Sequence, residues 1–329
     1  MSTSIIEVRA ATNKEWDELW RESANSTYFH SREWAEIWSS YTNGRIQPAP
    51  RLVLFSDGAE ALLPLSLERV AHGLAKRFLS SPAGTFGGWL SSERLGADHA
   101  HLLCDFLVTN FGNLVWRLNP YDEHSLQAPI RGKVEDETQL LDLSIGFDAI
   151  HRRWTKGRGA TARKARKARK AGVVVTSASD LGEFETYYEI YRDSLRRWGD
   201  KATAKYDWGL FQEICQRKSP YVILWLAVYQ GKTVAGALCF YSKNHVVYWH
   251  GAALEDYFTL RPVNLLLYEA IKHACEEGYA WFDFNPSGGH EGVRAFKRSF
   301  GTESRPSPVV IRRDWRLSII DAVAGRLKG

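Results

Sequence analysis

Two kinds of hydrophobic pattern alternate along the chain. Apolar residues three and four positions apart predict amphipathic helices over residues 13–23, 31–40, 97–112, 181–199 and 262–278. Between them lie β-rich runs, and the turn dipeptides Asp57-Gly58, Gln230-Gly231 and Lys243-Asn244 predict β-hairpins. Each half of the chain therefore runs helix, hairpin, strand, helix, strand, which predicts an α/β fold with a mixed sheet.

An internal repeat divides the chain into two halves. The segments "GNLVWRLNP" (112–120) and "GYAWFDFNP" (278–286) share a glycine, an apolar strand and Asn-Pro at the same spacing. The hairpin and helix that precede each copy also come in the same order, which favours duplication over coincidence. We therefore predict two domains, 1–145 and 146–329, related by internal duplication.

Positive charge is concentrated in one segment. Residues 151–170 hold six arginines, four lysines and no acidic residue, a charge of +10 in a chain whose net charge is +5. On a helix, one face would carry Arg163, Arg166, Lys167 and Lys170. Alanines recur every third position between them, so the opposite side can pack closely against a neighbour. Two interpretations stay open: a solvated helix face, or a surface that binds an anion such as a phosphate.

Several protein classes find no support in the sequence. No apolar run approaches the ~20 residues of a membrane span, and residues 1–16 lack the form of a secretory signal. The four cysteines are scattered without metal-ligand spacing, which fits free thiols in a reducing cytosol. There is no nucleophile motif, Walker loop or Rossmann glycine pattern. We expect a cytoplasmic protein with no membrane span, no metal and no cofactor.

Four segments together resemble one family: "FHSREWAEIW" (29–38), "RKARKARKAGV" (163–173), "LLLYEAIKHACEEGYAWFDFNPS" (265–287) and "GVRAFKRSFG" (292–301). The order of elements resembles the GNAT acyltransferase fold, and these motifs resemble its Fem-type branch of tandem-GNAT proteins. That branch is related to peptidoglycan interpeptide-bridge aminoacyltransferases and to cellulose-biosynthesis-type acetyltransferases. The resemblance implies two tandem GNAT-like domains, with the active site in the second. It also implies transfer of an acyl or aminoacyl group to an amine, from acyl-CoA or aminoacyl-tRNA.

The chain departs from its relatives in two places. No insertion in residues 174–220 matches the long helical-hairpin arm of the tRNA-dependent peptidoglycan enzymes. The glycine-rich pyrophosphate loop of CoA-binding GNATs is also missing, because the helix over 262–278 is preceded by "FTLRP". Glycines there let backbone N–H groups approach a phosphate. Arg261 could supply a positive charge at this position but not the backbone N–H groups. The missing loop and the basic segment favour aminoacyl-tRNA, bound through residues 151–170, over acyl-CoA.

The candidate catalytic residues lie in the second half. By resemblance, Lys297 is the lysine of the family's F-K motif, near the transferred acyl group, where it would stabilise an oxyanion by ~3 kcal/mol. The alternative is an exposed lysine on a short helix. Asp283, which alternates with two phenylalanines on a buried strand, would orient the substrate amine or form a structural ion pair with Arg294 or Lys297. The Asn-Pro that follows it favours a turn-forming role over chemistry.

The strand "VVYWHGAA" places Tyr248 and His250 on one face and Trp249 on the other. His250 would serve as a base beside the acyl channel or as a hydrogen-bonded core residue. Arg197, at the end of a helix, would extend the acceptor wall or complement the helix dipole. The full set of predicted substrate- and donor-binding residues is Arg163, Arg166, Lys167, Lys170, Arg197, Tyr248, Arg261, Asn285 and Phe296.

The sequence thus predicts an aminoacyltransferase that forms an amide by direct transfer from aminoacyl-tRNA to a small-molecule or peptide amine. One alternative is an acyl-CoA-dependent N-acetyltransferase of cell-envelope or exopolysaccharide biosynthesis. Another, of a different class, is a non-catalytic RNA-binding module that uses the basic segment.

Overall fold

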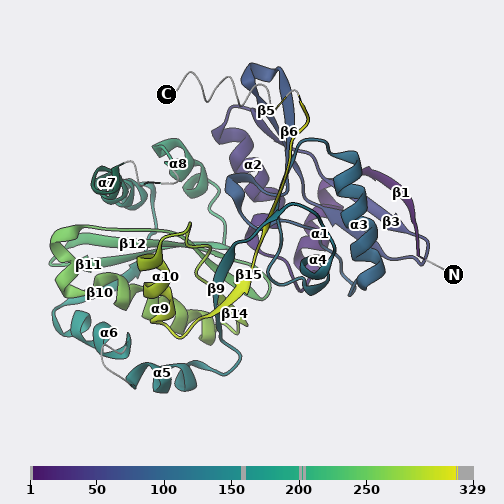
Figure 1. The fold of residues 1–329 in the computed structure, drawn as a ribbon. Coiled ribbons are helices and arrows are strands. Elements are labelled where there is room, and N and C mark those ends of the chain that lie inside the picture. The colour runs from purple at the N-terminus through teal and green to yellow at the C-terminus, as the bar shows by residue number, and fades with distance from the viewer. Residues whose placement is uncertain (1–2, 157–160, 200–201, 203–204, 316, 318–329) are drawn as a thin grey trace. The chain divides into compact units, whose positions relative to one another are not determined.

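The structure is a computed structural model that describes residues 3–156, 161–199, 202, 205–315 and 317 (Figure 1). The chain separates into two compact units. Unit 1 comprises residues 1–137 and 306–329, and unit 2 comprises residues 138–305. The predicted boundary at 145/146 therefore differs from the structural one, and the C-terminal residues join unit 1 instead of the second domain.

The described residues of unit 1 form α-helices and two sheets. The helices are α1 (Asn13–Glu22), α2 (Arg32–Tyr41), α3 (Ala97–Asn110) and α4 (Glu123–Gln127). One sheet has the order β1-β3-β4, with β1 (Ile5–Ala10), β3 (Arg51–Phe55) and β4 (Glu60–Leu63). The other has the order β2-β5-β6-β7-β16-β8, with β2 (Ile46–Pro48), β5 (Ser66–Val70), β6 (Ala75–Leu79), β7 (Leu114–Arg117), β8 (Lys133–Val134) and β16 (Val309–Arg312).

Unit 2 is built on one seven-stranded sheet of order β10-β11-β12-β13-β14-β9-β15. Its strands are β9 (Glu137–Asp142), β10 (Val173–Ser177), β11 (Val222–Tyr229), β12 (Lys232–Tyr241), β13 (His245–Ala253), β14 (Trp281–Asp283) and β15 (Glu303–Pro306). Its helices are α5 (Phe147–Thr155), α6 (Thr161–Lys170), α7 (Leu181–Trp198), α8 (Trp208–Gln216), α9 (Pro262–Glu276) and α10 (Glu291–Arg298).

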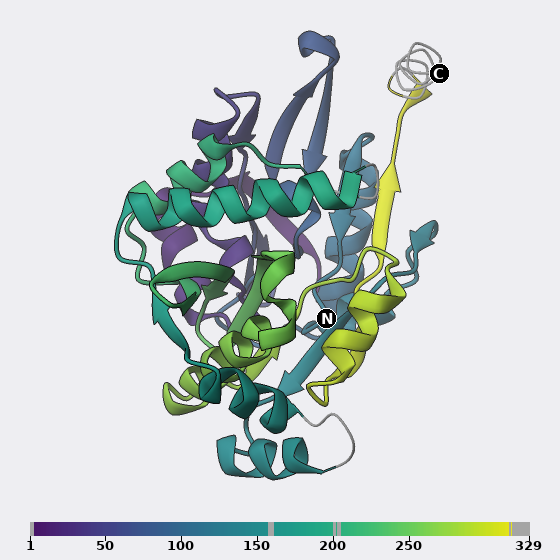
Figure 2. The ribbon, with the colours of Figure 1, turned by 90° about the vertical axis from the view of Figure 1, so that its left-hand side faces the viewer.

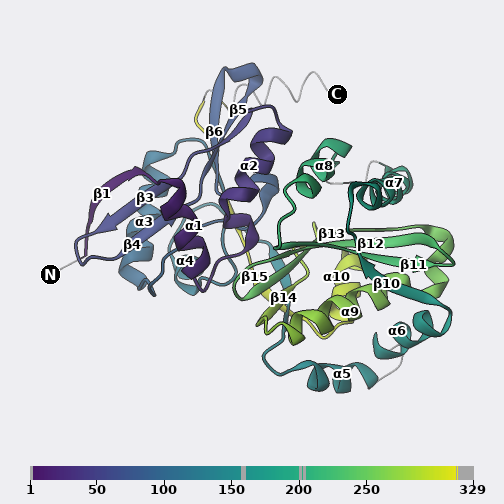
Figure 3. The same cartoon turned by 180° about the vertical axis from the view of Figure 1, so that it is seen from behind.

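The helices of unit 2 form layers on the two faces of its sheet. Helix α7 packs on β12 and β13, whereas α9 packs on the opposite face against β11 and β12. Helix α6 lies outside α9, next to α5 (Figure 1 and Figure 3). Figure 2 shows α7 as one long, uninterrupted helix. The core between the sheet and α9 is apolar and includes Leu266, Ile271 and Phe282.

Local sequence signals set the ends of these helices. The Asp180 side chain accepts a hydrogen bond from the Glu183 backbone N–H (2.9 Å) and so caps α7. Helix α7 ends at Gly199, which adopts a positive φ of 55°. Pro262 occupies the first turn of α9, where its missing N–H costs no helical hydrogen bond. In the described part of the chain, no helix combines the length and apolarity that crossing a bilayer requires.

The two repeats exchange their last strands. Each repeat strand, β7 in unit 1 and β14 in unit 2, has a parallel neighbour on one side, β6 and β13 respectively. On the other side β7 pairs antiparallel with β16 and β14 pairs antiparallel with β9. The orders β7-β16-β8 and β14-β9-β15 therefore match, but β9 follows the first repeat in sequence and β16 follows the second. This exchange moves the boundary away from residue 145. The predicted mixed α/β fold with two repeated units is confirmed.

Candidate functional site

The sheet of unit 2 opens between its two central parallel strands. Strands β13 and β14 pair over His245–Val247 and Trp281–Asp283, after which β14 ends while β13 continues to Ala253. In the pairing with β12, Leu238 lies opposite His250 and Cys239 opposite Tyr248, so Trp249 is the extra residue of a β-bulge. Beyond Val247, β13 therefore has no paired strand on the side of β14, and this interruption of the sheet is here called the opening.

Lys297 lies beside the end of β14. Its side chain is buried, with 5% of the residue exposed, so the alternative of an exposed lysine is wrong. The ammonium donates hydrogen bonds to the backbone carbonyls of Asn285 (2.6 Å) and Pro286 (3.1 Å). Helix α10, which carries Lys297, is held by the packing of Phe296 on the buried Phe300 (5.3 Å between ring centroids). These contacts fix a buried positive charge next to the opening.

Asp283, the last residue of β14, is fully buried and shapes the turn that follows. Its carboxylate accepts hydrogen bonds from the Asn285 backbone N–H (2.7 Å) and from the Thr138 hydroxyl. Asn285 adopts a left-handed conformation with φ of 62°, which supports its predicted turn-forming role. The Asp283 carboxylate thus holds the turn whose two backbone carbonyls accept hydrogen bonds from Lys297. Its role is therefore to position Lys297.

His250 lies on the face of the sheet covered by α7. Its Nδ1 is 2.6 Å from the Tyr187 hydroxyl, and the rings of Tyr191 and Phe211 lie 4.4 Å and 5.3 Å from its own ring. Burial lowers the pKa of His250 to about 3. The imidazole is therefore neutral near pH 7, and so low a pKa makes it a poor general base.

Tyr248 lies on the opposite face, so the prediction that it shares a face with His250 is wrong. Its ring packs near Phe284 (6.2 Å), in the apolar core on the α9 side, whereas Trp249 contacts Tyr206 (5.2 Å) on the His250 side. The physical reason is the bulge, because one extra residue reverses the alternation beyond it. Burial raises the pKa of the Tyr248 hydroxyl.

Arg197 and Arg261 lie near the far end of β13. The Arg197 guanidinium donates to the Ala253 carbonyl (3.4 Å) and stacks over the Phe258 ring (5.1 Å). Arg261 is exposed, with φ of 62°, and precedes α9. Few backbone donors remain there for a phosphate: Pro262 has no N–H, the Arg261 N–H donates to Phe258 (3.1 Å), and the Asn264 N–H donates to Arg261 (3.2 Å). A pyrophosphate cradle of the usual GNAT kind does not fit this helix start.

The predicted basic helix is α6, and it packs through its alanines. Ala165 and Ala168 are buried against the core, and α6 lies along α9. The four predicted donor-binding cations are exposed on its outer side: Arg163, Arg166, Lys167 and Lys170.

In unit 1 the equivalent gap is filled by the chain itself. The segment between β6 and α3 folds back, so that Gly87 bridges Leu118 just beyond β7 and Leu90 bridges Leu62. The side chains that it contributes, among them Phe86 and Leu90, are fully buried. In unit 2 the shorter connection, residues Glu255–Leu260, contributes no buried residue. The opening is therefore a feature of unit 2.

Sequence reasoning missed two parts of the site. Thr138 belongs to β9, which precedes the predicted second domain, and nothing in its local sequence announces the strand exchange. The wall around His250 was open to prediction, because Tyr187 and Tyr191 lie four residues apart on one predicted helix, a spacing that puts them on one face.

Comparison with known proteins finds a family match within unit 2. Residues 155–298 match the family model of the acetyltransferase (GNAT) domain. The lipid II:glycine glycyltransferase of Staphylococcus epidermidis is 32% identical over 80 residues, 22% of this chain and 19% of that protein. The protein of the same name from Staphylococcus haemolyticus is 33% identical over 98 residues, 28% of this chain and 23% of that protein. The chain thus matches about a fifth of the length of these curated relatives.

Solved structures show the same fold over most of the chain. The crystal structure of FemX has a TM-score of 0.69 at 15% identity and covers 93% of this chain and 97% of its own. The structure of L-PGS from Bacillus licheniformis has a TM-score of 0.56 at 12% identity, with 95% and 96% covered. Residues 155–298 thus resemble a GNAT acetyltransferase domain in sequence, and the whole chain shares the fold of FemX.

Proposed function

We propose that unit 2 transfers an aminoacyl group from an aminoacyl-tRNA to the amine of a small-molecule or peptide acceptor. The observation that carries this proposal is the buried Lys297 ammonium, held beside the point where β14 ends and β13 continues. The named relatives transfer a glycyl group, which supports an aminoacyl cargo. A tRNA donor places the reaction in the cytoplasm.

The reaction is a direct transfer. The deprotonated amine attacks the ester carbonyl, a C–N bond forms, and the C–O bond to the tRNA ribose breaks. The amine proton ends on the leaving ribose hydroxyl, so the products are an amide and free tRNA. Lys297 stabilises the negative oxygen of the tetrahedral intermediate, an effect of ~3 kcal/mol for a well-placed donor. His250, with its pKa of about 3, contributes to the acceptor wall and not to proton removal.

Two features favour tRNA over acyl-CoA as the donor. The start of α9 offers few free N–H groups to a pyrophosphate, and the exposed cations of α6 offer a surface to the backbone of an RNA. Acyl-CoA is the second candidate, because the matching family model describes an acetyltransferase domain. In that case the same attack would break a thioester, and the enzyme would act in cell-envelope or exopolysaccharide synthesis.

The test is donor choice. The protein is incubated with aminoacyl-tRNAs carrying labelled amino acids and, separately, with labelled acyl-CoAs, each with and without amine acceptors. We expect transfer to an amine, or slow donor hydrolysis without one, from aminoacyl-tRNA. Transfer from acyl-CoA alone would overturn the donor assignment. Silence with both donors, combined with salt-sensitive RNA binding that survives Lys297→Ala, would instead establish a non-catalytic RNA-binding module.

A further inference from the structure

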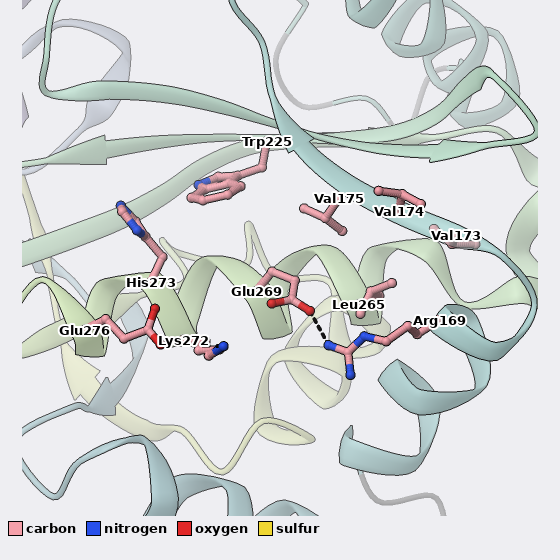
Figure 4. Close-up of a pocket in the computed structure, with 10 residues that line it drawn as sticks. All are labelled: Arg169, Val173, Val174, Val175, Trp225, Leu265, Glu269, Lys272, His273 and Glu276. Atoms are coloured by element: carbon pink, nitrogen blue, oxygen red, sulfur yellow. Dashed lines mark hydrogen bonds and ion pairs between the residues drawn. The ribbon is translucent and has the colours of Figure 1, made fainter.

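A pocket of about 430 Å³ lies between the edge of the unit 2 sheet and helix α9 (Figure 4). Trp225 of β11 and Val175 of β10 line it from the sheet, and Glu269, Lys272 and His273 line it from α9. Strand β12 separates these strands from the opening at β13 and β14. The pocket is therefore distinct from the proposed transfer site, and its volume is that of a small-molecule site.

The sheet side of the pocket offers a fixed aromatic surface. The Trp225 indole N–H donates to the Tyr241 hydroxyl (3.0 Å), and the His273 ring packs edge-on against the indole, 5.3 Å between centroids at 64°. Both contacts hold the indole in one orientation. A planar ring entering the pocket can stack on it without the cost of ordering the side chain.

The helix side offers carboxylate oxygens as hydrogen-bond acceptors. Glu269 forms an ion pair with Arg169 of α6, and Glu276 forms one with Lys272 (3.5 Å). In Figure 4 the Glu269 carboxylate lies across the pocket from Trp225. Carboxylates in this position accept hydrogen bonds from the amino group of a ligand.

The pocket also adjoins the basic helix. Arg169, the residue of α6 that reaches the pocket rim, is in the same helix as the exposed Arg166, Lys167 and Lys170. An anionic chain bound along α6 would thus pass the mouth of an aromatic pocket. Cations beside a stacking surface are the arrangement by which proteins hold single-stranded nucleic acid.

We infer that this pocket holds one unpaired nucleobase of an RNA whose phosphates lie on α6; that the RNA is the donor tRNA rests on the proposed function. The base stacks on Trp225 and donates its exocyclic amino group to Glu269. Cytosine, guanine and adenine carry such a group and uracil does not, so the pocket discriminates against uracil. A free amino acid would use the same carboxylates but would leave the cations of α6 without a role.

The experiment measures binding of fluorescent oligocytidine and oligouridine of equal length by anisotropy at constant salt. We expect the protein to bind the cytidine oligomer at least tenfold more tightly. Trp225→Leu should weaken cytidine binding at least tenfold. The matched control Trp208→Leu, another half-buried tryptophan of unit 2 that packs on Tyr188, should leave it unchanged.

Glu269→Gln gives a readout that simple loss of structure cannot mimic. It replaces the charged acceptor by a neutral amide that accepts more weakly and frees Arg169 from its ion pair, so the preference for cytidine should fall below threefold while uridine binding holds or tightens. Equal affinity of the unaltered protein for both oligomers, or equal effects of the two tryptophan variants, would overturn the inference. Aminoacyl transfer with base-indifferent binding would reject only the pocket. Base-selective binding without transfer would keep the pocket and reject the proposed function.

Discussion

Replacing Lys297 by methionine separates the two roles of its ammonium. The change keeps the length and apolar stem of the side chain but removes the donor to the Asn285 and Pro286 carbonyls. Hydrogen bonds from a charged donor contribute ~1.5–3 kcal/mol each, while burial of the ammonium itself costs several kcal/mol. We therefore expect a net loss of unfolding free energy of only about 1–3 kcal/mol, so that the variant can still fold.

The rate of transfer should fall by more than the loss of unfolding free energy would explain. An oxyanion donor stabilises the transition state by ~3 kcal/mol, and each 1.36 kcal/mol is tenfold in rate. We expect single-turnover transfer by folded Lys297→Met to be slower by roughly 100-fold or more at saturating donor. Urea unfolding supplies the stability of the same preparation. The matched control is Lys232→Met, which removes an exposed lysine that lies over Tyr257 (5.3 Å) and should change neither measurement much. A folded Lys297→Met variant that turns over within threefold of the unaltered protein would refute an oxyanion role.

Three further predictions follow from other contacts. Gly87→Ala should lower the urea stability of unit 1 by about 1–3 kcal/mol, because a Cβ at this position would overlap the Ser80 side chain. Gly96→Ala, where a Cβ meets nothing within 4 Å, should stay within about 0.5 kcal/mol. The pKa of His250 is about 3 in the folded protein against an ordinary 6.5. As the pH falls, the unfolded chain therefore takes up a proton on this histidine before the folded chain does. The contribution of the neutral His250 to the unfolding free energy is complete above pH 6.5 and is lost as the pH falls toward 3. His250→Gln should therefore reduce the fall in unfolding free energy between pH 7 and pH 4.5. A smaller fall should remain in this variant, because burial also lowers the pKa of His30, to about 4. A parallel fall in variant and unaltered protein would contradict this. Arg166→Ala with Lys167→Ala should lower the slope of log affinity for RNA against log salt by up to about 2, and an unchanged slope would show that α6 does not contact phosphates.

Elements with strong local signals could be predicted from the sequence. The helix expected over 181–199 runs Leu181–Trp198, and the one expected over 262–278 runs Pro262–Glu276. Each begins at a residue that favours helix starts, Asp180 or Pro262, and stops at or just before a glycine. The alanine spacing of the basic segment also indicated the buried side of α6, because three-residue spacing keeps small residues on one face.

Features that depend on pairing between distant segments escaped prediction. The bulge at Trp249 leaves no mark in "VVYWHGAA", since a strand with one extra residue has the same composition as a regular one. The buried state of Lys297 depends on two backbone carbonyls that precede it by twelve and eleven residues. The turn that carries them is held by Asp283, which in turn bonds Thr138 of the exchanged strand. Such contacts are set by the fold as a whole, and the proposed chemical roles of these residues stay predictions until the variants are measured.

The duplication explains why one repeat can hold a site while the other does not. Both units keep a strand with a parallel neighbour on one side and an exchanged antiparallel strand on the other, so both can form a gap where the parallel pair separates. In unit 1 the segment around Gly87 bridges to Leu118, just beyond β7, and contributes the buried apolar side chains of Phe86 and Leu90. In unit 2 the bulge at Trp249 lies in β13 beyond the paired residues, and the Lys297 ammonium is bonded to the turn that follows β14. Because each sheet also needs a strand from beyond the other repeat, neither unit is complete in its own half of the sequence.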